Sequence, residues 1–189
     1  DIPPYYIYLK TVYHLSQEAR SGIKEFALPP EFRNTLFDFQ QNAVKIAAKH
    51  LNNDKRNGAM IGDVVGLGKT ITACAIAKIY EMTFASSTLI ICPANLQDMW
   101  DKYKQKYDLK ADIISMQKPI DVENTWNYRL IIVDESHNLR NSSGKRYHNI
   151  QDLIHKLDCK TLLLTATPYN KDFSDLASQL KLFLSEDQD

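Results

Sequence analysis

The feature that most constrains this chain is residues 59–71, which read Ala-Met-Ile-Gly-Asp-Val-Val-Gly-Leu-Gly-Lys-Thr-Ile. The pattern predicts a short buried strand, a glycine-bearing loop and the start of a helix. A triphosphate crowds the backbone that wraps around it, so residues without a Cβ are needed at the bend. Backbone N–H groups would then meet the anion at a helix N-terminus. Lys69 would reach the β- and γ-phosphates, and the Thr70 hydroxyl would hold Mg²⁺.

The loop departs from the strict phosphate-loop pattern at one position. That pattern has Gly five residues before Gly68, where this chain has Asp63. The alternative is a Gly-rich strand-to-helix turn with a surface lysine. Three of the six glycines in the chain are Gly62, Gly66 and Gly68, and this concentration favours the phosphate loop.

Composition sets broad limits on the kind of protein. The 189 residues suffice for one domain or slightly more, with an apolar fraction of 44% and a charged fraction of 24%, as in soluble globular proteins. No apolar run approaches the roughly 20 residues of a membrane span, and no secretory signal is visible. Acidic and basic residues balance at 23 each, so net charge does not decide for or against nucleic acid. We expect a cytoplasmic protein, with this chain as a segment of a larger one.

Cysteine and histidine patterns indicate no metal centre. Cys74, Cys92 and Cys159 are few, odd in number and far apart, so buried free thiols are expected, which suits a reducing cytoplasm. His148 and His155 lie seven residues apart on one predicted helix face, and we interpret them as a surface pair.

The N-terminal part divides into three segments. Residues 1–22 are predicted to form a helix with an aromatic side, and residues 23–34, which contain Pro29-Pro30, form a linker. We assign residues 1–34 to this helix and linker, as a possible junction to a missing upstream domain, and residues 35–189 to one nucleotide-binding domain. A helix to about Leu51 follows, with Asp38 as its expected N-cap.

Beyond the loop, apolar strands alternate with helices. Helices are predicted over residues 69–82, 94–107, 147–157 and 172–184, strands over 88–92, 111–115, 130–133 and 161–165, and loops over 116–128 and 138–145. The continuous apolar runs are typical of parallel strands covered by helices on both faces. The chain is therefore predicted to be an α/β protein, with a three-layer P-loop parallel sheet that carries helices on both faces.

Two strands end in polar residues. Asp134 and Glu135 follow the strand of residues 130–133, at the carboxyl end where α/β sheets bind ligands. Asp134 can hold the metal beside Thr70, and Glu135 can polarise the attacking water. Thr165 and Thr167 could sense the γ-phosphate, although alone they indicate only a strand-ending turn.

Together these segments resemble the first RecA-like lobe of the Swi/Snf family of helicase-like ATPases, within superfamily two, over residues 36–184. Residues 62–70 look like the first motif of that family, in which Asp replaces the leading Gly. Leu89-Ile90-Ile91-Cys92-Pro93, with Leu96 and Trp100, looks like the next motif. Asp134-Glu135-Ser136-His137 matches the Asp-Glu-x-His box, and Thr165-Ala166-Thr167-Pro168 is similar to the third motif. The residues of these last two motifs are most similar to those in the bacterial branch of the family.

The resemblance implies a role for individual residues. It implies ATP and Mg²⁺ as cofactors, with catalytic roles for Lys69, Asp134 and Glu135, and with Thr70 and Asp134 at the metal. His137, Thr165 and Thr167 would couple ATP hydrolysis to movement on nucleic acid, while Pro93 and Asn95 would contact the nucleic acid. Gln40 falls where the family reads adenine, and Phe37 or Phe39 could stack near the base. Nucleotide contacts would come from Gln40, Asp63, Gly66, Leu67, Gly68, Lys69, Thr70 and Ile71.

The resemblance also implies an activity. Family members couple ATP hydrolysis to movement along nucleic acid, here most reasonably double-stranded DNA, and close two lobes around ATP. The chain lacks the length for a second lobe, whose arginines would serve the γ-phosphate, so the fragment alone should be nearly inactive. We also expect the strand of residues 161–165 to lie between those of the phosphate loop and of residues 130–133. Another P-loop NTPase and a non-catalytic nucleotide-binding interaction module remain alternatives.

Overall fold

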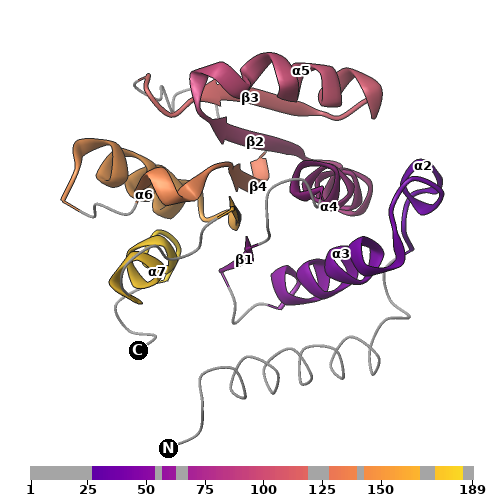
Figure 1. Cartoon of the computed structure of the whole chain (residues 1–189), viewed down its shortest axis with the longest axis horizontal. Coiled ribbons are helices and arrows are strands. Elements are labelled where there is room, and N and C mark those ends of the chain that lie inside the picture. The colour runs from indigo at the N-terminus through magenta and orange to yellow at the C-terminus, as the bar shows by residue number, and fades with distance from the viewer. Residues whose placement is uncertain are drawn as a thin grey trace, which may run out of the picture.

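The computed structural model describes residues 27–53, 57–62, 68–118, 128–139, 143–166 and 173–184. The predicted helix of residues 1–22 lies outside these ranges. In chain order the elements are α2 (Pro30–Arg33), α3 (Asp38–Leu51), β1 (Gly58–Gly62), α4 (Lys69–Phe84), β2 (Ser87–Cys92), η1 (Ala94–Leu96), α5 (Gln97–Lys106), β3 (Ala111–Ser115), β4 (Tyr128–Val133), η2 (Ser136–Leu139), α6 (Lys145–Leu157), β5 (Lys160–Thr165) and α7 (Phe173–Leu180) (Figure 1).

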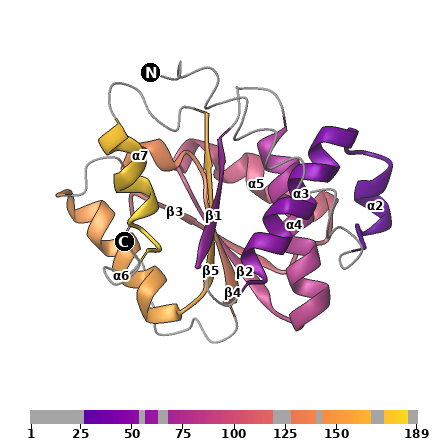
Figure 2. The same cartoon turned by 90° about the horizontal axis from the view of Figure 1, so that it is seen from below.

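The five described strands form one parallel sheet in the order β1-β5-β4-β2-β3. The expectation that β5 lies between β1 and β4 is confirmed. Helices α3, α4 and α5 lie on one side of the sheet and α6 and α7 on the other (Figure 2). The predicted three-layer α/β architecture is therefore confirmed. Because all strands are parallel, their carboxyl ends share one edge, where the predicted site residues follow the strands.

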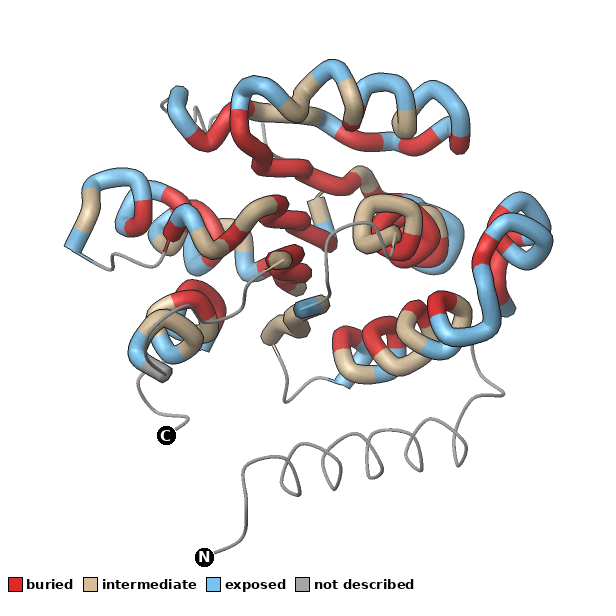
Figure 3. The backbone as a smooth tube through the Cα atoms, viewed as in Figure 1, coloured by how far each residue is buried: buried red, intermediate tan, exposed pale blue. Residues whose placement is uncertain are grey.

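The core consists of two clusters separated by the sheet. In β4, Leu130 and Ile132 pack with the α3–α5 cluster, whereas Ile131 and Val133 pack with the α6–α7 cluster. This is the two-residue period of a strand. Both faces of the central strands are buried, which explains their unbroken apolar sequence (Figure 3).

The N-terminal expectations need two corrections. The predicted linker contains the short helix α2, whose Phe32 is fully buried and stacks on Tyr107 with ring centroids 4.4 Å apart. Asp38 is not the N-cap of α3 but its first residue, and Phe37 takes the cap position. The Gln40 side chain accepts the Phe37 backbone N–H at 2.9 Å, so one backbone donor at the start of the helix is satisfied from within the first turn.

Other corrections concern burial and boundaries. Strand β1 is half-buried rather than buried, because it is an edge strand of the described sheet. Tyr128 begins β4, although it was assigned to a loop, and η2 occupies part of the predicted loop of residues 138–145. Helix α7 ends at Leu180, and the next residues form a turn that buries Leu182 and Phe183.

The thiol expectation is confirmed, since Cys74, Cys92 and Cys159 are all buried and free. His148 and His155 are both exposed, as expected of a surface pair. Within the described ranges, none of the helices combines the length and apolarity needed to cross a membrane.

Candidate nucleotide site

The junction between β1 and α4 carries the phosphate-loop residues. Strand β1 ends at Gly62 and α4 begins at Lys69, while Asp63, Gly66 and Leu67 lie outside the described ranges. Lys69 and Thr70 therefore occupy the first turn of a 16-residue helix. The free N–H groups and the dipole of such a turn favour an anion.

Gly68 precedes this turn in a conformation that requires glycine. Its φ is +84°, and an added Cβ would lie 2.2 Å from Nε2 of Gln40. The carbonyl of Gly68 accepts bonds from the Thr72 N–H at 3.1 Å and the Thr72 hydroxyl at 3.0 Å. Gln40, predicted to contact adenine, thus lies beside the last glycine of the loop and is buried.

Asp134 lies at the carboxyl end of β4 and is only 5% exposed. Its Oδ2 accepts the indole N–H of Trp100 at 2.9 Å, and its Oδ1 accepts the Glu135 backbone N–H at 2.8 Å. Burial raises the pKa of this carboxyl, while the Trp100 and Glu135 bonds and the charge of Lys69 act against the rise. Lys69 begins the helix that follows β1 and Asp134 follows β4, so both residues lie at the carboxyl-end rim of the parallel sheet.

Glu135, His137 and Thr165 form a connected group beside Asp134. Glu135 has a φ of +51°, a conformation that costs a non-glycine residue about 1 kcal/mol. Its Oε2 lies 3.1 Å from Nδ1 of His137, and the same nitrogen lies 3.3 Å from Oγ1 of Thr165. The Glu135 side chain is 31% exposed, so solvent reaches it. Thr167 lies outside the described ranges.

The turn after β2 lies at the same edge. Pro93 is buried and Asn95 is exposed, at the start of η1 and α5. The Ala94 N–H donates to Oε1 of Gln117 at 3.1 Å, which ties this turn to the segment after β3. Asn95 is thus accessible to a ligand, whereas Pro93 shapes the turn.

The aromatic residues before Gln40 are exposed. Phe37 is 70% exposed and Phe39 is 51% exposed, with nearly parallel rings whose centroids are 6.0 Å apart. They precede the buried Gln40 in sequence, and their exposure leaves them accessible to a ligand. Ile71 is half-buried and packs against the α3–α5 cluster.

Sequence reasoning missed two buried contacts. Trp100 was noted only as part of a motif, and its bond to Asp134 was not anticipated. Ser136 Oγ donates to Oε1 of Gln179 at 2.7 Å, and neither residue is measurably exposed. Gln179 at a core position of an otherwise amphipathic helix was a signal that could have revealed the second contact.

The residues at this rim suit Mg²⁺. The Asp134 carboxylate and the Thr70 hydroxyl are oxygen donors, which a hard cation prefers. No group of three His, Cys, Asp or Glu side chains placed to hold a metal occurs among the described residues. One or two protein ligands completed by phosphate oxygens and water are typical of Mg²⁺ sites.

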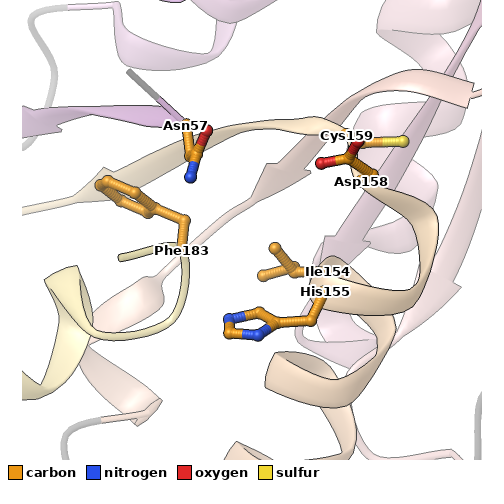
Figure 4. Close-up of a pocket in the computed structure, with 6 residues that line it drawn as sticks. All are labelled: Asn57, Ile154, His155, Asp158, Cys159 and Phe183. Carbon is orange, nitrogen blue, oxygen red and sulfur yellow. The ribbon is translucent and has the colours of Figure 1, made fainter. Parts of the chain in front are cut away.

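A separate cavity of about 190 Å³ lies at the amino ends of the strands, opposite the rim formed by their carboxyl ends. Its lining residues are Asn57, which precedes β1, Asp158 and Cys159, which precede β5, and Ile154, His155 and Phe183 (Figure 4). Because these positions adjoin the amino ends of strands, the cavity is distinct from the rim that carries Lys69 and Asp134.

Comparisons with known proteins show which proteins this chain is similar to. The family description "SNF2-related domain" matches residues 39–119. An uncharacterized ATP-dependent helicase, YqhH, of Bacillus subtilis is 33% identical over 151 residues, which cover 68% of this chain and 27% of YqhH. The chain belongs to the SNF2-related family.

Other relatives and solved structures extend the similarity of this SNF2-related domain. The mouse DNA annealing helicase and endonuclease ZRANB3 is 29% identical over 170 residues, covering 75% of this chain and 15% of ZRANB3. The Sulfolobus solfataricus SWI2/SNF2 ATPase core in complex with dsDNA superimposes with a TM-score of 0.62 at 19% identity, covering 78% of this chain and 35% of that one. The chain thus spans well under a third of these curated relatives, and the structural likeness supports the RecA-like fold.

Proposed function

We propose that this SNF2-related domain is the ATP-binding lobe of an ATPase that couples ATP hydrolysis to movement along, or remodelling of, double-stranded DNA. The observation that carries the proposal is the shared carboxyl-end rim of the parallel sheet, with Lys69 at the start of α4 and the buried Asp134 directly after β4. An ammonium at the start of a helix and a carboxylate at the end of a strand suit a triphosphate and its cation. YqhH is named an ATP-dependent helicase, which supports ATP as the nucleotide.

Each residue has a task in this proposal. Lys69 binds the β- and γ-phosphates, and the N–H groups at the start of α4 bind phosphate oxygens. Thr70 and Asp134 hold Mg²⁺, which neutralises charge on the phosphates when bound. Gln40 contacts adenine beside Gly68, and Asp63, Gly66, Leu67 and Ile71 complete the nucleotide site.

In this proposal Glu135 orients and deprotonates the attacking water. It is partly exposed and contacts His137, which also contacts Thr165 at the end of β5. A change in the γ-phosphate can therefore reach His137 and Thr165 through Glu135, with Thr167 continuing the path. Pro93 and Asn95 serve the DNA side.

The domain division is also part of the proposal. Residues 35–189 form the ATP-binding lobe, and residues 1–34 join it to an upstream domain. A second RecA-like lobe of the same protein supplies arginines for the transition state, which contribute on the order of 10³–10⁵ in rate. The fragment alone should therefore turn over ATP very slowly.

The test is ATP turnover by the intact protein that contains this chain, with and without duplex DNA. Turnover should rise with DNA and be lost in Lys69→Ala, while circular dichroism stays unchanged. Binding of ATP in preference to GTP separates this proposal from a GTPase. Rapid turnover by the isolated fragment would refute the need for a second lobe, and nucleotide binding without any turnover would favour the non-catalytic module.

A further inference from the structure

The indole of Trp100 makes a polar contact that packing alone does not require. Trp100 lies on α5 and is fully buried in the α3–α5 cluster. Its Nε1–H donates to Oδ2 of Asp134 at 2.9 Å, across 34 positions of sequence. A buried indole N–H needs an acceptor. A backbone carbonyl would suffice for that need, yet the acceptor here is the carboxylate at the end of β4.

The bond fixes the orientation of the carboxylate. Oδ1 is held by the Glu135 backbone N–H at 2.8 Å and Oδ2 by Trp100, so both ends of the carboxylate plane have a fixed donor. A carboxylate has about four lone-pair sites. The two bonds leave one site on each oxygen for a cation. An indole donates only one hydrogen bond and accepts none, so it cannot compete for the metal itself.

We infer that Trp100 is a positioning residue for Mg²⁺, which holds Asp134 in the orientation that accepts the cation. The inference rests on the proposed nucleotide site and adds to it a residue from α5, the helix that follows the Pro93 turn. Partners that orient a ligand typically contribute 10- to 100-fold to metal affinity.

The decisive variant removes the N–H and keeps the shape. In the intact protein, Trp100 is replaced by its benzothienyl isostere, in which sulfur takes the place of the N–H group. Trp100→Phe is the genetically simple counterpart. Tyr107→Phe is the matched control, because Tyr107 is another buried aromatic residue of the same cluster and no contact to Asp134 involves it.

The main readout is ADP affinity measured by calorimetry, in EDTA and over a Mg²⁺ titration. For the isostere we expect unchanged affinity in EDTA and a Mg²⁺ midpoint about 10- to 100-fold higher than in the wild type. ATP turnover should fall at low Mg²⁺ and recover at high Mg²⁺. Tyr107→Phe should match the wild type in both measurements.

Four results would overturn the inference. If the isostere variant has the wild-type Mg²⁺ midpoint, Trp100 contributes only to packing. The same conclusion follows if the variant loses ATP turnover and excess Mg²⁺ does not restore it. If the wild-type protein binds ADP equally with and without Mg²⁺, the Mg²⁺ role of Asp134 and Trp100 fails while the nucleotide site stands. If it binds no ADP under either condition, the proposed nucleotide site fails, and this inference fails with it. The wild-type titration therefore distinguishes the two failures.

Discussion

The buried pair of Ser136 and Gln179 allows a quantitative prediction about stability. Ser136 follows Glu135 in η2, and Gln179 lies on α7, 43 positions further along the chain. Their side chains share a 2.7 Å hydrogen bond from which solvent is absent, since both residues have 0% exposure. Removing one partner leaves the other buried without this bond, which costs about 1–3 kcal/mol.

Both single variants should therefore be destabilised. Ser136→Ala removes the donor to Oε1 of Gln179, and Gln179→Leu removes the acceptor while keeping a similar volume. We expect each to lower the free energy of unfolding by about 1–3 kcal/mol. The double variant leaves neither partner of this bond behind, so its loss should be smaller than the sum by about 1–2 kcal/mol, within the range of coupled neighbours.

The assay is a double-mutant cycle by urea unfolding, with Thr35→Ala as the control. The Thr35 hydroxyl also donates to a carbonyl, that of Glu31 at 2.7 Å, but it is exposed, so its loss should cost less than about 0.5 kcal/mol. If the effects of Ser136→Ala and Gln179→Leu simply add to within about 0.3 kcal/mol, the pair is energetically uncoupled and the reasoning is wrong.

Two further predictions concern the α4 region. Ala85 ends α4 with a φ of +50°, so Ala85→Gly should stabilise the protein by about 0.5–1 kcal/mol in thermal unfolding, whereas Ala43→Gly inside α3 should destabilise it by about as much. Burial raises the pKa of the Cys74 thiol to about 12. Above pH 9 the thiol loses its proton in the unfolded chain but keeps it in the native protein, so the free energy of unfolding falls by up to about 1.4 kcal/mol per pH unit. In urea titrations between pH 8 and 10, the free energy of unfolding of Cys74→Ala should therefore fall less steeply with pH than that of the wild type.

Much of the fold followed from sequence because the strands carry unambiguous apolar runs. The central strand β4 and its neighbours β5 and β2 have no polar residue in their middle positions, so burial on both faces was the consistent interpretation. The half-buried state of β1 was not predictable in this way, because a short strand of small and apolar residues has the same pattern at an edge as at the centre.

The site was predictable where its functional residues directly follow a recognisable strand in the sequence. Asp134 and Glu135 follow a strand directly, so parallel topology alone brings Asp134 towards Lys69. The contacts of Trp100 and Gln179 join residues 34 and 43 positions apart. A single sequence contains no local pattern for such pairs, and only the packing of α5 and α7 on the sheet brings them together.

The turn after β4, where Glu135 has a φ of +51°, has a consequence for how the Asp-Glu-Ser-His segment responds to its surroundings. Asp134 accepts a hydrogen bond from Trp100 of α5 on one face of the sheet, while Ser136 donates one to Gln179 of α7 on the opposite face. A displacement of either outer layer therefore pulls on the same four-residue turn. Through this turn, a movement of the helices on one face of the sheet is transmitted to the helices on the other face.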